Sequence, residues 1–271
     1  MGRLQDKIAV VTGAGAGIGK ASAIRFAEEG ATVLVTSRSE TNAAETAHAI
    51  AEAGGRAISL AVDIGNADDL DRMITTAMAE FGRIDVLFNN AMNVDFDSAA
   101  RDTDFLALDP EIFLTSMRTT VLGGLIAAKQ ALPHMLANGS GSIIFNSSIA
   151  SLAGDVSQFS YGGAKAAVNW YVRAIAANYG PRGVRCNGIL PGVIKTVAQS
   201  AWVTPEIDAV YLNAASSPRL GLPEDIAAVA SFLASDEAAF VNGALWTVDG
   251  GTTCLMPYVP GLRTLAAADP A

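Results

Sequence analysis

Short apolar runs alternate with longer amphipathic segments through most of the chain. Apolar runs of this length are typical of buried strands, and apolar positions three and four residues apart are typical of helices. The predicted strands cover residues 8–11, 31–36, 57–62, 84–88, 142–145, 184–190 and 245–248. The predicted helices cover residues 20–29, 40–53, 67–81, 110–132, 161–179 and 224–234. This alternation predicts a doubly wound α/β fold of the Rossmann type, with a mostly parallel seven-stranded sheet and helices on both faces.

Two segments fit the alternation less well. Residues 197–218 have weak helical periodicity and are interpreted either as a lid over the sheet edge or as an ordinary surface excursion. The tail at residues 252–271 contains Pro257 and Pro260 and has no assigned role. No linker-like stretch divides the chain, so residues 1–271 are predicted to form a single domain.

The first predicted strand runs into a glycine-rich turn, and a helix follows it. In this order, glycines let the backbone approach a pyrophosphate closely, and the helix N-terminus offers N–H groups and a positive dipole end. The alternative interpretation is a plain tight turn. We predict a dinucleotide-binding turn that contains Gly13, Gly15, Gly17, Ile18 and Gly19.

The end of the second predicted strand bears on the choice of dinucleotide. Many such folds place an acidic residue there, which holds the ribose 2′-hydroxyl. This chain has Ser37 and Arg38 instead, and a guanidinium can pair with a 2′-phosphate. The favoured cofactor is therefore NADP(H), with NAD(H) as the alternative. A surface arginine without a ligand is the other interpretation of Arg38.

A candidate acid/base pair lies at the start of the longest predicted helix. Tyr161 and Lys165 are four residues apart, so they share a helix face. A nearby ammonium stabilises a phenolate and can lower its pKa by roughly 1–3. This would bring the tyrosine pKa closer to the range of an acid/base catalyst. Such pairs also occur on many helices as solvated surface pairs, so the pair alone is weak evidence.

Composition limits the class of partner. The chain has 51% hydrophobic residues, 17% charged residues and a formal net charge of −9, without a basic cluster. This argues against nucleic acid and anionic membranes as partners. Cys186 and Cys254 have no paired spacing and the N-terminal residues lack the core of a signal peptide, so a reducing, cytoplasmic location is expected. The two histidines, His48 and His134, are far apart, so no metal site is predicted.

Taken together, four motifs resemble the short-chain dehydrogenase/reductase family across essentially the whole chain. They are Thr12-Gly13-x-x-x-Gly17-x-Gly19, Asn89-Asn90-Ala91, Ser148 thirteen residues before Tyr161, and Pro191-Gly192 after the sixth predicted strand. The resemblance implies a ketone or alcohol substrate, an NAD(P)(H) cofactor and a homotetramer built through the helices that contain Thr120 and Tyr161.

The resemblance also implies a role for each matching position. Tyr161 would be the general acid/base, and Ser148 would hydrogen-bond the substrate oxygen. Lys165 would hold the nicotinamide ribose and lower the pKa of Tyr161. The resemblance places Asp63 and Ile64 near the adenine, Asn89 on the adenosine side, and Ile194 and Thr196 near the carboxamide and phosphates. The other implied cofactor-binding residues beyond the glycine turn are Ser37, Arg38, Ala91, Pro191, Gly192, Tyr161 and Lys165.

Two positions depart from the family pattern. Thr120 stands where the family has an asparagine that helps to hold a water next to the lysine. A threonine hydroxyl is shorter and can bond its own helix carbonyls, so either the proton relay is built differently or turnover is impaired. Met92 stands where the family usually has glycine, and it either shapes a hydrophobic pocket or partly blocks one.

The main hypothesis is an NADP(H)-preferring oxidoreductase that interconverts a secondary alcohol and a ketone. The candidate pocket residues are apolar, which favours an apolar substrate: Met92, Phe96, Leu152, Phe159, Trp202 and Tyr211. The alternatives are a nucleotide-binding sensor or scaffold with weak or no catalysis, and a dehydratase or isomerase that uses the same tyrosine.

Overall fold

A single parallel sheet forms the centre of the structure. The computed structural model describes residues 2–92, 101–200 and 203–268. The strands are β1 (Ile8–Val11), β2 (Thr32–Ser37), β3 (Arg56–Ala61), β4 (Val86–Asn89), β5 (Gly141–Asn146), β6 (Val184–Pro191) and β7 (Leu245–Val248). They form a seven-stranded sheet in the order β3-β2-β1-β4-β5-β6-β7. Every pairing between these strands is parallel, so the predicted Rossmann-type fold is confirmed, and the sheet has no antiparallel member among the described strands.

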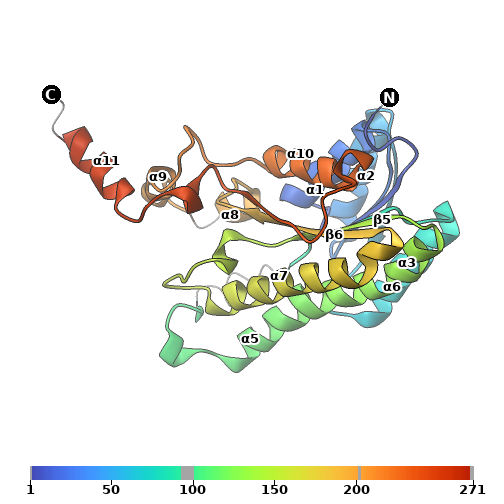
Figure 1. The fold of residues 1–271 in the computed structure, drawn as a ribbon, viewed down its shortest axis with the longest axis horizontal. Coiled ribbons are helices and arrows are strands. Elements are labelled where there is room, and N and C mark those ends of the chain that lie inside the picture. The colour runs from blue at the N-terminus through green and yellow to red at the C-terminus, as the bar shows by residue number, and fades with distance from the viewer. Residues whose placement is uncertain (1, 93–100, 201–202, 269–271) are drawn as a thin grey trace.

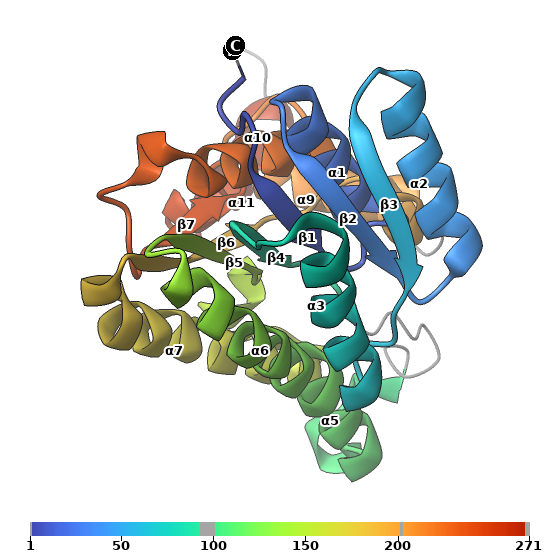
Figure 2. The ribbon, with the colours of Figure 1, turned by 90° about the vertical axis from the view of Figure 1, so that its right-hand side faces the viewer.

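Helices cover both faces of this sheet, as Figures 1 and 2 show. One layer contains α1 (Gly17–Glu28), α2 (Glu40–Glu52) and α10 (Pro223–Ala234). The opposite layer contains α3 (Ala67–Phe81), α6 (Gly123–Ala137) and α7 (Phe159–Tyr179). Side chains alternate along β1, with Val10 in the core under the second layer and Ala9 and Val11 in the core under the first. A strand buried on both faces needs an unbroken apolar run, which is the pattern that the sequence shows.

The helix predicted over residues 110–132 is not continuous. It consists of α5 (Pro110–Ser116), a π-helical turn (Met117–Leu122) and α6. The Thr119 hydroxyl donates to the Thr115 carbonyl at 2.8 Å, a side-chain bond that competes with the regular helix ladder. At Gly123, a Cβ atom would collide with the Ile64 carbonyl, so the helix passes the end of β3 at very close range. π-Helical turns of this kind occur frequently at functional sites, and this one contains Thr120.

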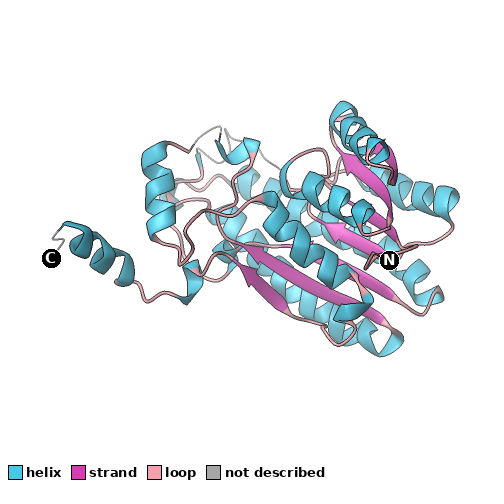
Figure 3. Ribbon diagram, turned by 90° about the horizontal axis from the view of Figure 1, so that it is seen from above, coloured by secondary structure: helices cyan, strands magenta, loops and turns pink. Residues whose placement is uncertain are grey.

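The two segments that fitted the pattern poorly contain further helices. Residues 197–218 include α8 (Val197–Ser200) and α9 (Pro205–Asn213). The tail contains α11 (Val259–Ala268), which was not predicted and which extends away from the sheet at one end of the molecule (Figure 3). Arg263 holds it by donating to the Asn213 and Ala215 carbonyls at 3.0 and 2.6 Å. Leu262 and Leu265 remain exposed, so the burial pattern that usually reveals a helix is missing here.

Candidate active site

The predicted functional residues converge at the carboxyl ends of the strands. The glycine turn follows β1, and Asn89, Asn146 and Pro191 end β4, β5 and β6. Since neighbouring strands are parallel, these ends lie along one edge of the sheet, which is where open α/β sheets bind their ligands. The structure therefore brings the residues predicted to form the site to one edge of the sheet.

The glycine turn has the geometry of a backbone cradle. Gly13 adopts φ +66°, and a Cβ atom there would lie 2.8 Å from the Cα of Ala91. Ala16 precedes α1 and provides no side-chain cap, so no side chain of the cap residue covers the N–H groups of the first turn. A Cβ atom at Gly17 would lie 3.2 Å from the Thr196 methyl, which brings the loop after β6 against this turn. Free N–H groups in a close-fitting backbone turn suit a pyrophosphate.

A chain of polar contacts connects the glycine turn to the catalytic side. The Thr12 hydroxyl accepts from the Asn90 and Ala91 amides at 3.0 and 3.1 Å. The Asn90 side chain donates to the Thr12 carbonyl at 3.1 Å and accepts from the Asn146 side chain at 2.9 Å. Sequence reasoning assigned a role to Asn89 but not to Asn90 or Asn146, because their partners lie on strands that are distant in the chain.

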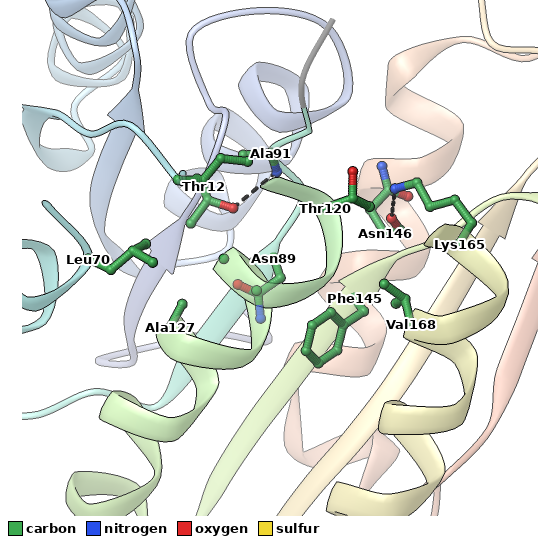
Figure 4. A pocket seen from close by; sticks show the side chains of 13 residues that line it. Thr12, Leu70, Asn89, Ala91, Thr120, Ala127, Phe145, Asn146, Lys165 and Val168 are labelled. Carbon is green, nitrogen blue, oxygen red and sulfur yellow. Dashed lines mark hydrogen bonds between the residues drawn. The ribbon is translucent and has the colours of Figure 1, made fainter. Parts of the chain in front are cut away.

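Ser148, Tyr161 and Lys165 come together as predicted. Tyr161 lies in the first turn of α7, and the Ser148 side chain lies close enough to its phenol to lower the phenol pKa. One turn further along α7, Lys165 is buried, and its Nζ atom lies 5.6 Å from the centroid of the tyrosine ring. That nitrogen donates to the Asn146 carbonyl at 2.6 Å, as Figure 4 shows. The arrangement provides a hydroxyl donor, a phenol and a buried amine within one site.

The electrostatics of the protein alone differ from the expectation for Tyr161. Burial raises the pKa of the Tyr161 phenol, and the nearby Ser148 side chain offsets only part of that increase. Burial also lowers the pKa of Lys165 from 10.5 to about 8. The expected fall in the tyrosine pKa is therefore wrong for these residues alone, because the low dielectric surroundings destabilise both charged forms.

A short turn fixes Ser148 against α7. The Ser148 hydroxyl accepts from the Ala150 amide at 3.1 Å, and the Ser151 hydroxyl donates to the Ser148 carbonyl at 2.5 Å. Asn169 donates to the Ser151 hydroxyl at 2.7 Å. Asn169 is four residues after Lys165 and therefore on the same helix face, a spacing that could have revealed it in the sequence.

A small cavity of about 10 Å³ lies between Thr120 and Lys165 (Figure 4). Its lining also includes Asn89 and Asn146, and neither the Asn89 Nδ2 atom nor the Asn146 Oδ1 atom has a hydrogen-bond partner among the described residues. Thr120 is buried in its wall. The departure at position 120 thus lies in the wall of the same cavity as Lys165, where its side chain contributes to the polar surroundings.

The other predicted cofactor residues lie at neighbouring strand ends. Arg38 follows β2, is exposed, and forms no ion pair with another residue that the structure describes. Asp63 follows β3 and accepts from the Gly65 amide at 2.8 Å. Beyond β6, Ile194 is buried and pairs with Gly221 in an isolated bridge.

Four of the six apolar pocket candidates lie within the described residues. Phe159 contacts Phe105 edge to face with ring centroids 5.7 Å apart, and Leu152 is half exposed. Met92 and Tyr211 are half-buried. The remaining two candidates, Phe96 and Trp202, lie outside the described residues. Within the described ranges, no three potential metal ligands gather, and no helix is long and apolar enough to cross a membrane.

Comparison with known proteins gives matches over nearly the full chain. Residues 13–253 match the family model described as enoyl-(acyl carrier protein) reductase. A probable short-chain type dehydrogenase/reductase of Bradyrhizobium diazoefficiens is 39% identical over 268 residues, which cover 98% of this chain and 95% of that protein. The 7alpha-hydroxysteroid dehydrogenase of Escherichia coli K12 is 36% identical over 92% of this chain and 95% of its own length.

Solved structures agree with these matches. A 7alpha-hydroxysteroid dehydrogenase in complex with NADH and 7-oxo glycochenodeoxycholic acid superposes with a TM-score of 0.87 at 35% identity. The match covers 92% of this chain and 95% of that chain. At this identity and coverage, the likeness extends beyond the general fold.

Proposed function

The chain belongs to the short-chain dehydrogenase/reductase family and is an NAD(P)-dependent oxidoreductase that acts on CH–OH groups, and from this premise we propose that Tyr161 is its general acid/base. The observation that carries the proposal is the closeness of the Ser148 side chain to the Tyr161 phenol, with Lys165 buried one helical turn away. These groups meet the requirements for proton transfer at a carbonyl oxygen.

Each residue of this set has a distinct part in the proposed reaction. Ser148 donates a hydrogen bond to the ketone oxygen and stabilises the charge that develops on it. Tyr161 gives its proton to that oxygen, and in the reverse direction it takes the proton from the alcohol. The nicotinamide cofactor, when bound, supplies or accepts the hydride. Lys165 would hold the cofactor ribose, and its ammonium would favour the phenolate form of Tyr161.

We infer that the cofactor site prefers NADP(H). The glycine turn would hold the pyrophosphate, and Asp63 with Ile64 would border the adenine. At the end of β2, the exposed Arg38 would pair with the 2′-phosphate, and no carboxylate stands at positions 37 or 38 to hold a free 2′-hydroxyl. The relative whose structure was described above was solved with NADH, so the preference rests on the residues of this chain.

Arg38→Ala is expected to weaken NADPH binding by roughly 10- to 100-fold, because a charge-assisted hydrogen bond contributes about 1.5–3 kcal/mol. NADH binding should change less than about twofold on the same scale, since NADH has no 2′-phosphate. Both titrations follow nicotinamide fluorescence. The control is Arg56→Ala, because Arg56 is exposed at the opposite, amino end of the sheet, where β3 begins. Wild-type protein that binds NADH as tightly as NADPH would contradict the preference.

We propose an apolar secondary alcohol or its ketone as the substrate. Phe159, Leu152, Met92 and Tyr211 support this class, as does the 7-oxo bile acid bound by the structural relative. We also propose that residues 1–271 act as a single domain, with 197–218 as a lid, and that the chain assembles as a homotetramer through α7 and the helical segment that contains Thr120. A panel of cyclic ketones that includes oxo-steroids, assayed with NADPH and NADH, tests the activity. Cofactor binding without turnover on the whole panel would instead favour a nucleotide-binding protein.

A further inference from the structure

The first turn of α7 is built in an unusual way. Gln158, which precedes the helix, adopts the left-handed conformation with φ +57° and provides no side-chain cap. A non-glycine residue in this region is uncommon and strained. The N–H groups of the first turn therefore need an acceptor from elsewhere in the chain.

That acceptor is Asp102, which lies more than fifty positions earlier in the sequence. Its Oδ2 atom accepts from the Ser160 amide at 2.8 Å, and its backbone carbonyl accepts from the Gln158 amide at 2.6 Å. The same segment contributes Phe105, whose ring packs edge to face on Phe159. Three contacts from one segment thus hold the residues that immediately precede Tyr161.

Stability alone does not explain this carboxylate. Asp102 is only 4% exposed, and its Oδ1 atom has no hydrogen-bond partner among the described residues. Asp85 is equally buried, but it accepts from the Ile8 amide at 2.8 Å and forms an ion pair with Arg83 at 2.6 Å. No ion pair between described residues involves Asp102. A buried charge that is only partly satisfied costs stability, and proteins retain such costs mainly at functional sites.

We propose that Asp102 is a positioning residue for the reaction, an inference that rests on the proposed function of Tyr161. By accepting a hydrogen bond from the Ser160 amide, Asp102 fixes the position of the first turn of α7. The Tyr161 side chain extends from this turn toward Ser148. The catalytic geometry depends on this anchor because a misplacement of about 1 Å at a reacting group can cost roughly 100-fold in rate. Asp102 touches neither substrate nor cofactor in this role.

Asp102→Ala removes the acceptor and is expected to lower kcat by roughly 10- to 100-fold, while the Kd for NADPH changes less than about twofold. Asp102→Asn keeps an oxygen that can accept from the Ser160 amide, so its kcat should stay within about threefold of wild type. The matched control is Asp104→Ala, because Asp104 is an exposed cap in the same segment that accepts from the Leu106 amide at 3.0 Å. It should leave kcat unchanged.

The inference is overturned if Asp102→Ala retains wild-type kcat, or if Asp102→Asn loses as much activity as Asp102→Ala. Asp102→Ser, which is too short to reach the amide, replaces the alanine variant if that variant does not fold. Amide hydrogen exchange provides a readout without turnover: exchange at Ser160 and Tyr161 should accelerate in the alanine or serine variant and not in the asparagine variant. Wild-type protein that is inactive on the ketone panel would refute the proposed function, whereas unchanged exchange would refute the anchor.

Discussion

Tyr161→Phe is expected to lower kcat by roughly 10²- to 10⁴-fold, the range typical for loss of a general acid/base. The substitution removes only the phenol oxygen, which lies beside the Ser148 side chain and is the proposed proton donor to the ketone. The ring remains, so the packing of the first turn of α7 should persist. Steady-state rates of ketone reduction and alcohol oxidation measure the effect in both directions, and nicotinamide fluorescence measures the Kd of NADPH, which should change less than about threefold.

A second tyrosine on the same helix provides the control. Tyr171 is 37% exposed and takes no part in the site, so Tyr171→Phe should leave kcat within experimental error of wild type. A Tyr161→Phe variant that keeps more than a tenth of the wild-type kcat would show that another group transfers the proton. Loss of cofactor binding in that variant would indicate a structural defect instead, and its rate could not be interpreted chemically.

The parts of the site that the sequence revealed are those encoded by local spacing. Tyr161 and Lys165 share a helix face because they are four residues apart, and parallel strands bring the glycine turn and Asn89 to one edge. The bounds of α3, Ala67–Phe81, were predicted correctly, because Asn66 caps its start and Gly82, at φ +75°, ends it. Such signals need no knowledge of distant residues.

The parts that the sequence did not reveal depend on contacts between distant segments. Asp102 is an ordinary loop aspartate until the fold brings it to the Ser160 amide, and the Asn146 carbonyl becomes a partner of Lys165 only when β5 and α7 pack together. The same reason explains the π-helical turn, because Gly123 must pass close to the Ile64 carbonyl. Periodicity predicts which face of an element is buried, and it does not identify the polar partner on that face.

The expected direction for the tyrosine pKa was wrong for a related reason. Helical spacing predicts that Lys165 and Tyr161 are neighbours, but it says nothing about how deeply the pair is buried. Desolvation raises the pKa of the phenol and lowers that of the amine, because both charged forms lose solvation. In the proposed reaction, the charged cofactor and its ribose hydroxyls would add interactions that favour the ammonium. The acid/base pair would then reach its working state only with the cofactor bound.

Lys165→Met is expected to separate activity from stability. Loss of the ammonium should lower kcat by roughly 10²- to 10³-fold and weaken NADPH binding, since the proposed role of this group is to hold the ribose and stabilise developing charge. The free energy of unfolding should respond differently. Lys165 is 2% exposed with a pKa of about 8 instead of 10.5, so near neutral pH its charge destabilises the folded state. Methionine fills a similar volume without a charge, at the cost of the hydrogen bond to the Asn146 carbonyl.

The dependence of this effect on pH follows from the direction of the pKa change. Between pH 8 and 10.5 the unfolded chain binds a proton at Lys165 that the folded protein does not bind. The free energy of unfolding of the wild type therefore increases with pH over this range, and that of the variant lacks this increase. Denaturant unfolding near pH 7 and near pH 10 measures this effect. The free energy of unfolding of the wild type, relative to that of Lys165→Met, should increase by about 2–3 kcal/mol between these two pH values. Lys7→Met is the control, because the Lys7 ammonium already pairs with Asp236 at 2.7 Å, and it should leave activity intact. A difference between wild type and Lys165→Met that stays constant with pH would mean that Lys165 keeps its ordinary pKa in the folded protein, and that burial does not set the electrostatics of the site.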